Sequence, residues 1–306
     1  MLNFVIMATF VIAGGTGFVG SHLHKILQSM GHTVYVLSTR TKDIPFSKHL
    51  IYWDTEKGII DDSFHIKNAH VINLAGAGVA DKRWTEERKK EIVQSRLSSL
   101  YTLEKAIQKG QIEALHLCSA SAIGYYGFSQ GLLQETHTGD DSFLSTTCKK
   151  WEEAAWSIAE MGVPTSIARI GIVLGKDGGA LPALTNSMKW GIAGKPGSGQ
   201  QIYSWIHLHD VCRMLYFLSI GQKVGIYNAV APHPVPLSEV IKQIRKYAYP
   251  YSIPLPAPEW AIKVLLGEMS TEVLKSTQVS AHKILTEGFD FFYPTIEACI
   301  SHLYHK

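Results

Sequence analysis

The sequence has no long hydrophobic run, no cluster of basic residues and few cysteines. No stretch reaches the roughly 18 to 20 consecutive apolar residues that a membrane-spanning helix needs, so we expect no membrane partner. The formal net charge is only +3 and Lys and Arg are spread evenly, which argues against nucleic acid as a partner. The four cysteines are isolated, with no CxxC pair and no histidine at metal-ligand spacing. The sequence therefore predicts no disulfide and no metal site, and favours a reducing, cytoplasmic location.

The first thirteen residues are apolar, but they lack the basic residues with which a signal peptide begins. The first lysine is Lys25, far downstream, and the apolar stretch leads directly into a glycine motif. We therefore interpret this stretch as a buried first strand. Met7 is an equally natural start, which would make residues 1–6 an extension.

Strands and helices alternate along the first half of the chain. The chain has 306 residues, and its composition of 46% hydrophobic and 18% charged residues is ordinary for a globular enzyme and unlike that of a disordered chain. Strands are expected at residues 10–13, 33–37, 50–53, 71–74, 115–119 and 165–173, and helices at 21–30, 85–108 and 147–161. The strands are apolar on both faces, as in parallel sheets covered by helices on each side. The fold class predicted is α/β, a Rossmann-type doubly wound parallel sheet with a smaller C-terminal region.

Two domains are expected. Residues 7–235 would form the dinucleotide-binding domain with part of the substrate cleft, and residues 250–303 a small helical domain. Within the second, a helical unit is expected at 258–275 and a last helix at 295–304.

Three glycines form a G-x-x-G-x-x-G motif between the first strand and the first helix. The first glycine permits the tight turn, the second lets the backbone approach a pyrophosphate, and the third lets the helix pack against the strand. The helix N-terminus adds amide donors and positive dipole. A strand before and a helix after are the context that supports a dinucleotide site. The expected cofactor contacts here are Gly14, Thr16, Gly17, Phe18, Val19 and Gly20.

The end of the second strand predicts which dinucleotide binds. An NAD enzyme has an acidic residue there for the ribose 2′-hydroxyl, but this chain has Ser38, Thr39 and Arg40, with no carboxylate before Asp43. A guanidinium binds a 2′-phosphate through two parallel hydrogen bonds, and a hydroxyl adds another. Thr39 and Arg40 therefore favour NADP(H) as the cofactor.

Motifs spread over nearly the whole chain resemble one family. Asn73-Leu74-Ala75-Gly76 is similar to the N-x-A-G element of the short-chain dehydrogenase/reductase superfamily, and residues 119–127 resemble the serine strand of its extended branch. The combination resembles the atypical epimerase-like family 39U, member 1 type, within the NAD-dependent epimerase/dehydratase superfamily. The other matching segments are 83–84, 91–96, 151–152, 169–175, 178–181, 197–200, 205–207 with Asp210, 254–267 and 288–294.

The resemblance implies an extended-type fold with NADP(H) across the carboxyl edge of the sheet. Leu74, Ala75 and Gly76 would line the cofactor after the strand at 71–74. Val173 would contact its nicotinamide half, and Glu91 and Arg96 would face its ribose–phosphate side.

The catalytic pair of the superfamily has no counterpart in this sequence. Active members use a Tyr-x-x-x-Lys pair near a serine. In the expected segment, Leu144 and Cys148 occupy the two positions, or Ser145 and Lys149 after a shift of one residue, and neither pair contains a phenol. Ser121 is the catalytic residue we predict from its position alone.

Other residues are candidate substitutes. The pair Tyr125 and Tyr126 could reach the cleft, although packing explains it equally well. His207 and Asp210 could form an acid/base pair, or could cap the point where a strand enters a helix. Trp205 and the loop at 200–201 would line the substrate cleft.

Two functions remain open at this stage. The first is an NADP(H)-dependent oxidoreductase or epimerase acting on a carbonyl or secondary alcohol of an unknown small molecule. The alternative is a non-catalytic NADP(H)-binding sensor or scaffold, because the Tyr–Lys pair is missing. The sequence does not indicate an oligomeric state.

Overall fold

An eight-stranded sheet forms the centre of the structure, a computed structural model that describes residues 7–39, 49–128 and 130–305. The strand order is β14-β8-β6-β5-β1-β2-β3-β4, and only β4 runs antiparallel to its neighbour. The strands are β1 (Thr9–Ala13), β2 (Thr33–Ser38), β3 (Leu50–Asp54), β4 (Ile59–Ile60), β5 (Ile66–Asn73), β6 (Ile112–Ala122), β8 (Thr165–Ile170) and β14 (Gly225–Ala229).

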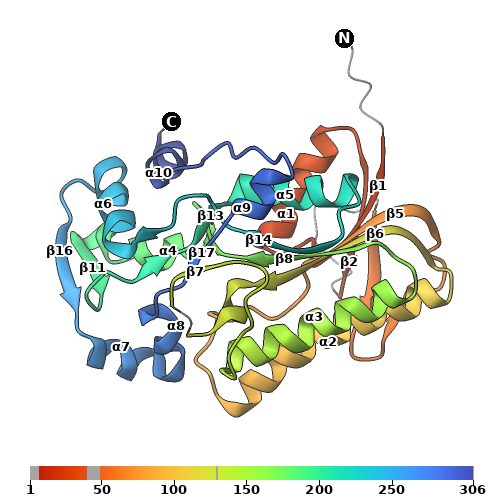
Figure 1. The fold of residues 1–306 in the computed structure, drawn as a ribbon, viewed down its shortest axis with the longest axis horizontal. Helices are drawn as coiled ribbons and strands as arrows, with labels where there is room; N and C mark the ends of the chain where they lie inside the picture. The colour runs from red at the N-terminus through yellow and green to blue at the C-terminus, as the bar shows by residue number, and fades with distance from the viewer. Residues whose placement is uncertain (1–6, 40–48, 129, 306) are drawn as a thin grey trace, which may run out of the picture.

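Helices cover both faces of this sheet, as Figure 1 shows. α1 (Phe18–Ser29) and α5 (Leu208–Ile220) pack on one face, and α2 (Glu86–Gln108) and α3 (Phe143–Glu160) on the other. Along β1, Phe10 and Ile12 enter the core on the side of α1, whereas Val11 and Ala13 enter the core under α2 and α3. The predicted doubly wound parallel fold is confirmed.

Local signals set the beginnings of several helices. Thr85 caps α2 because its side chain accepts a hydrogen bond from Arg88 N, and Glu86 and Glu87 occupy the positive end of the helix dipole. Thr295 caps α10 (Ile296–Tyr304) in the same way. The predicted bounds of these two helices are therefore correct to within one residue.

Several predicted elements were wrong in extent. The helix expected at 21–30 begins at Phe18, and the strands expected at 71–74 and 115–119 begin at Ile66 and Ile112. The strand expected at 165–173 is two strands, because Gly171 turns the chain into a second sheet of β9 (Ile172–Gly175), β10 (Gly178–Gly179) and β13 (Trp205–His207). A side chain at Gly171 would lie 2.6 Å from the carbonyl oxygen of Ser204. The helix expected at 147–161 begins at Phe143, and the unit expected at 258–275 divides into α7 (Glu259–Leu266), η3 (Gly267–Met269) and α8 (Ser270–Leu274).

A smaller lobe lies beside the sheet, at the left of Figure 1. β11 (Ile192–Pro196) pairs there with β16 (Ile253–Ala257), and α6 (Leu237–Tyr247) packs on α10. In β16 the amide of Ile253 donates to Gly191 O of the neighbouring chain segment, so Pro254 and Pro256 face the outer edge. The lobe combines segments from both sides of the predicted boundary at 235–250, and the division into two domains stays a prediction.

The remaining described elements are short or join the two parts. They are η1 (Ile123–Tyr126), β7 (Leu132–Leu133), α4 (Leu181–Thr185), η2 (Met188–Trp190), β12 (Ile202–Tyr203), β15 (Val235–Pro236), β17 (Gln278–Val279) and α9 (His282–Thr286).

Asp210 attaches the C-terminal segment to the sheet domain. Its carboxylate, fully buried in the first turn of α5, accepts hydrogen bonds from the amides of Phe292 and Tyr293, each at 2.9 Å. His207 is the N-cap of the same helix and accepts a hydrogen bond from His209 N at 2.9 Å. His207 and Asp210 therefore have the capping and anchoring roles that the sequence left open beside catalysis.

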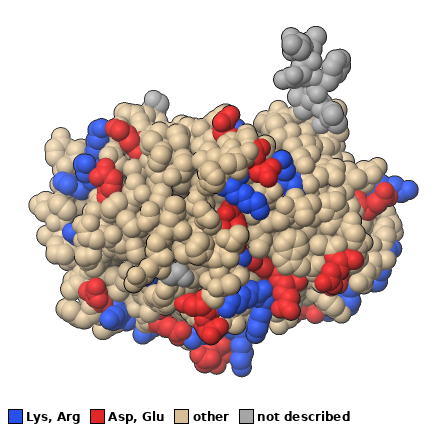
Figure 2. Space-filling view, viewed as in Figure 1, with Lys and Arg blue, Asp and Glu red and all other residues tan. Residues whose placement is uncertain are grey.

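The surface shows no segregation of charge on the face seen in Figure 2, where acidic and basic side chains are interspersed on a mostly uncharged surface. None of the helices in the described part of the chain has the length and apolar character needed to cross a bilayer.

Two buried histidines make the stability of the fold depend on pH. Burial lowers the pKa of His116 to about 4 and that of His207 to about 3, from an ordinary value of 6.5. Protonation below pH 6.5 therefore favours the unfolded chain, and stability is complete above that pH and falls as the pH decreases. We expect the free energy of unfolding in urea to decrease by about 1 kcal/mol per histidine between about pH 7.5 and 5.5.

The variant His116→Gln should show a shallower decrease over this pH range. The matched variant His65→Gln, at an exposed site, should keep the wild-type pH dependence. Equal pH dependence in all three proteins would contradict the assignment to His116.

Candidate functional site

The glycine motif forms a tight turn against the end of β5. Gly14 has a φ of +78°, and a side chain there would lie 2.7 Å from Leu74 C and 2.8 Å from Ala75 N. The amide of Gly17 donates to Gly14 O at 3.0 Å, and a Cβ at Gly20 would collide with the same carbonyl oxygen. Glycine is thus required at the first and third positions, and the predicted residues Leu74 and Ala75 lie beside the turn.

The N-terminus of α1 is open to a ligand at this turn. Thr16 and Gly17 are exposed, and Phe18 and Val19 are half-buried at the first helical positions. A side chain at Gly175 would meet the Phe18 ring at 2.6 Å, so this ring packs against the end of β9, the strand that contains Val173. Five of the predicted cofactor residues, Thr16 to Val19 and Val173, are therefore grouped around one end of α1.

One of the two predicted specificity residues, Thr39, lies at the end of β2, next to β1 in the sheet. Thr39 directly follows β2 and is exposed. Arg40 lies outside the described residues, so its part in cofactor choice stays a prediction from the sequence.

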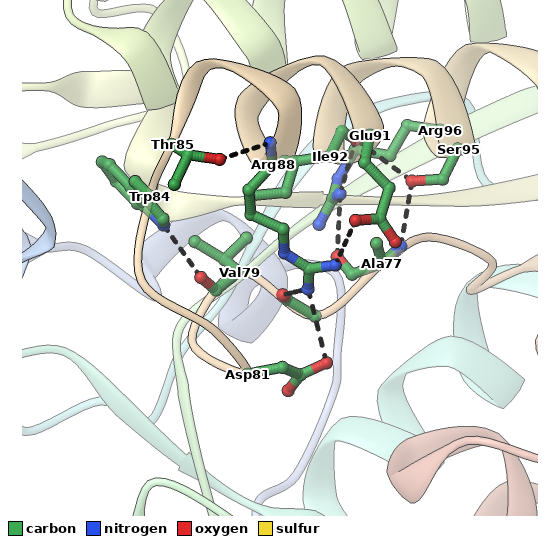
Figure 3. A network of polar contacts seen from close by, with 11 residues as sticks. Ala77, Val79, Asp81, Trp84, Thr85, Arg88, Glu91, Ile92, Ser95 and Arg96 are labelled. Atoms are coloured by element: carbon green, nitrogen blue, oxygen red, sulfur yellow. Dashed lines mark hydrogen bonds and ion pairs between the residues drawn. The ribbon is translucent and has the colours of Figure 1, made fainter.

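Figure 3 shows how α2 holds the loop after β5. Ala77 N donates to Ser95 Oγ at 2.9 Å, and Arg96 Nη1 donates to Ala77 O at 3.0 Å. Glu91 forms an ion pair with Arg88 at 2.7 Å, with 54% of its side chain exposed. The two predicted residues on α2 therefore have different surroundings: Glu91 is bound to Arg88 at the surface, whereas Arg96 is buried beside the exposed residue Gly76.

A cavity of about 260 Å³ opens at the carboxyl ends of β6 and β8. One wall comes from α2, α3 and these strand ends, and the other from β12 and the segment around α8. Its lining includes Arg96, Ala122, Leu144, Cys148, Trp151, Ile170, Tyr203, Glu272 and Lys275.

The lining of the cavity distinguishes the two alignments of α3 with the missing Tyr–Lys pair. Leu144 and Cys148 face it, whereas Ser145 donates hydrogen bonds to Tyr125 O and Asp140 O, and Lys149 donates to Asp140 O. The first of the two sequence alignments is therefore the structural one. An aliphatic side chain and a thiol thus stand at the positions that the sequence aligned with the Tyr and Lys of active superfamily members.

Ser121 belongs to a buried network centred on Arg169. Its hydroxyl donates to Glu152 Oε1 at 2.6 Å, and the same carboxylate receives two hydrogen bonds from the guanidinium of Arg169, both at 2.8 Å. Arg169 also donates to Tyr126 Oη at 3.1 Å, which in turn donates to Asn228 Oδ1 at 2.6 Å. Burial opposes the charge on Arg169, but the hydrogen bonds and charge of Glu152 outweigh it and raise its pKa.

Several predicted cleft residues have structural roles. Tyr126 is fully buried in the network, and the ring of Tyr125 lies 3.4 Å from the Arg169 guanidinium carbon. Trp205 is fully buried and donates to His233 O, and Gln201 donates to Pro196 O and Val273 O. For Tyr125 and Tyr126 the packing alternative therefore holds. The expectation that Trp205 and Gln201 line the cleft was wrong, because their polar groups are bound within the protein.

Two weak acids that line the cavity, Cys148 and Tyr203, are neutral at physiological pH. Burial raises the pKa of Cys148 to about 11 and that of Tyr203 to about 12, so neither ionises readily. Burial lowers the pKa of Arg96, whose guanidinium stacks on Trp151 at 4.8 Å and has no acidic partner among the described side chains. Lys275, Glu272 and Tyr203 were missed by the sequence because no motif marks them and only folding brings them to the cavity.

Within the described part of the chain, no three His, Cys, Asp or Glu side chains are grouped in a way that could hold a metal ion.

Known proteins share both parts of this architecture. The profile of the NAD dependent epimerase/dehydratase family matches residues 10–229, which is well over half of the chain. The chain belongs to the NAD dependent epimerase/dehydratase family. A second profile, described as a domain of unknown function (DUF1731), matches residues 257–303 and agrees with the family resemblance of the C-terminal segment.

Curated relatives in this epimerase family match over nearly their whole length. The epimerase family protein YfhF of Bacillus subtilis is 35% identical over 301 residues, covering 95% of this chain and 96% of its own. The chloroplastic homologue of the epimerase family protein SDR39U1 in Arabidopsis thaliana is 35% identical over 94% of this chain and 84% of its own. These relatives confirm the family 39U resemblance.

A solved member of the epimerase family has the same fold. The crystal structure of the human epimerase family protein SDR39U1 (isoform 2) with NADPH superposes with a TM-score of 0.85 at 27% identity, covering 97% of this chain and 99% of its own.

The geometry predicts that Glu152 is structural. Glu152→Gln would leave the Arg169 charge, 1% exposed, without a carboxylate, and should lower the free energy of unfolding by about 3–5 kcal/mol. Ser121→Ala removes one hydrogen bond to the same carboxylate and should lower it by about 1 kcal/mol. Both values can be measured by urea denaturation.

Glu153→Gln is the matched control, because Glu153 is the exposed neighbour on the same helix. It should change stability by less than about 0.5 kcal/mol. A Glu152→Gln protein as stable as this control would contradict the structural role of the network.

Proposed function

We propose that the chain binds NADP(H) across the carboxyl edge of its sheet and is an oxidoreductase or epimerase acting on a carbonyl or secondary alcohol. The observation that carries the proposal is the turn at Gly14, Gly17 and Gly20, where added side chains would meet backbone at the first and third positions. The human relative crystallised with NADPH supports the same cofactor.

The residues present fit a dinucleotide. A side chain at Gly14 or Gly20 would meet backbone atoms. Because glycine has no side chain, the turn can pack closely there and leave the N-terminus of α1 exposed. Amides at a helix N-terminus donate hydrogen bonds to phosphate groups, and the positive end of the helix dipole attracts the negative charge of a pyrophosphate. The Thr39–Arg40 pair would bind the 2′-phosphate, which is the sequence argument for NADP(H) over NAD(H).

When bound, the cofactor would supply hydride transfer, and the protein would supply position and electrostatics. The cavity at the ends of β6 and β8 would receive the substrate. Leu144, Cys148 and Trp151 form part of its wall. The Arg96 guanidinium, which the family resemblance places toward the ribose–phosphate side of the cofactor, lines the same cavity and would also stabilise negative charge that develops on a substrate oxygen. Tyr203, whose phenol stays protonated because of its raised pKa, is a candidate hydrogen-bond donor.

A second function is favoured by one specific observation. Leu144 and Cys148 occupy the Tyr and Lys positions, and the Ser121 hydroxyl donates to Glu152. These contacts support a protein that binds NADP(H) without turnover, as a sensor or scaffold whose shape or partner changes with the oxidation state of the cofactor.

The four buried free cysteines support a reducing, cytoplasmic location as part of this proposal. A small molecule, with no nucleic acid or membrane, remains the proposed class of partner.

Cofactor binding is tested by thermal stabilisation with NADP, NADPH, NAD and NADH. We expect the phosphorylated cofactors to raise the melting temperature, by an amount equivalent to about 2.7 kcal/mol at a hundredfold excess over the dissociation constant. Arg40→Ala should reduce the shift with NADP and NADPH, because the 2′-phosphate loses its cation.

The control is Lys67→Ala, which removes an exposed cation near the opposite end of β5 and should keep the full shift. No stabilisation of the wild type by any of the four cofactors would contradict NADP(H) binding. An unchanged shift in Arg40→Ala would remove the argument for NADP(H) over NAD(H).

Turnover separates the two functions. A panel of aldehydes, ketones and secondary alcohols, followed by NADPH absorbance, should give slow oxidation or reduction that Ser121→Ala reduces, because Ser121 is the catalytic residue predicted from the sequence. If Ser121→Ala retains full turnover, its role is limited to the Glu152 network. A panel without turnover, together with partner binding that differs between the NADP and NADPH forms, would favour the sensor.

A further inference from the structure

The second wall of the cavity comes from the segment around α8, far along the chain from the glycine motif. Lys275 directly follows α8 and lines the cavity together with Glu272. Its side chain is only 8% exposed, which is unusual for a lysine outside a strong ion-pair network.

The backbone on both sides of Lys275 is fixed. Its own amide donates to Thr271 O at 3.0 Å, and the amide of Thr277 donates to Ile202 O at 3.1 Å. Ile202 N in turn donates to Ser276 Oγ at 2.7 Å. The backbone at Lys275 is therefore fixed by α8 on one side and by β12 on the other, so little ordering of this backbone is needed when a ligand binds.

The ammonium group of Lys275 is incompletely satisfied. It lies 2.5 Å from Glu272 Oε2, yet the contact does not have hydrogen-bond geometry, and Nζ is buried with no hydrogen-bond partner among the described residues. Nζ also lies 5.3 Å from the centroid of the Phe128 ring, and its charge helps to lower the pKa of Asp140, but neither group accepts a hydrogen bond from it. Its three donor positions are thus matched by one ion-pair contact, to Glu272 in the preceding turn.

The charged side chains lining the cavity do not balance. Two cations, Arg96 and Lys275, face one carboxylate, Glu272, and the rest of the lining is apolar or uncharged. A buried excess positive charge is unfavourable unless an anion compensates it. A ligand with one negative charge would provide that compensation.

The position of the cavity assigns this anion to the substrate. The pyrophosphate site at the glycine motif lies at the end of β1, whereas the cavity lies at the ends of β6 and β8. Because β5 separates β1 from β6, the two sites are roughly 10 Å apart across the sheet.

We propose that Lys275 binds an anionic group, a carboxylate or a phosphate, on a small carbonyl or alcohol substrate, and that this anion replaces Glu272 as the partner of the ammonium group. This inference rests on the proposed function and specifies its substrate class. The C-terminal segment thereby contributes the recognition residue, and the sheet domain contributes the cofactor site.

Calorimetric titration tests the proposal with matched probes. Acetoacetate and dihydroxyacetone phosphate carry the two candidate anions, and methyl acetoacetate and dihydroxyacetone are their neutral counterparts. The wild type should bind at least one anion more tightly than its neutral counterpart, and Lys275→Gln should weaken that binding by about tenfold or more. The anion that binds identifies carboxylate or phosphate.

Glu272→Gln provides a test in the opposite direction, since it removes the competing carboxylate and should tighten anion binding severalfold. Lys246→Gln is the matched control, because Lys246 also pairs with a glutamate, Glu297 at 2.7 Å, but on the surface. It should bind the anion as the wild type does, and melting temperatures should show that all three variants are folded.

Titrations with and without NADP separate this inference from the proposed function. Absence of a cofactor shift in the wild type would count against the proposed function alone, because anion binding is measured independently. The proposal for Lys275 is overturned if charged and neutral probes bind the wild type equally, if neither anion binds, or if a folded Lys275→Gln protein keeps wild-type affinity for the anion.

Discussion

The bidentate ion pair between Arg169 and Glu152 is the contact on which the shape of the cleft depends. It joins β8 to α3, and through Ser121 it reaches the end of β6, while Tyr126 extends it to Asn228 on β14. The rotation of α3 about its axis is thereby fixed, and with it the residues that α3 turns toward the cavity. Two charges buried together gain little net stability, but they strongly disfavour any arrangement in which they separate. Their contribution is to specify one packing of the helix on the sheet.

The sequence predicted those elements whose local signals agree with one another. The helix at Glu86–Gln108 combined a capping threonine, acidic residues in its first turn and a buried stripe. α5 was not predicted, because apolar residues on most of its sides blur the helical period of a segment packed between the sheet and the C-terminal segment. α6 carried a clear amphipathic pattern that could have been used, with Glu239 in its first turn. The single strand expected at 165–173 failed at Gly171, where a close approach to Ser204 decides the path and leaves no periodic signal.

The sequence could predict only those parts of the candidate site whose residues belong to a local motif. The glycine turn and the residues after β5 fall in the expected place, because a motif between a strand and a helix specifies its own geometry. A shift of one residue in α3 turns a side chain by about 100°, so the sequence could not choose between Cys148 and Lys149, whereas the folded helix does. Lys275 reaches the cavity because its segment forms tertiary hydrogen bonds with Ile202, and no local sequence pattern in either segment predicts this contact.

The two prolines of β16 have a consequence for how copies of this chain behave at high concentration. An exposed strand edge is a template on which another chain can add, through its unused amide and carbonyl groups. Pro254 and Pro256 leave the outward edge of β16 without amide donors at alternate positions, so an incoming strand finds acceptors but no matching donors. The lobe can thus keep a short, exposed strand edge that does not serve as a template for strand addition between molecules.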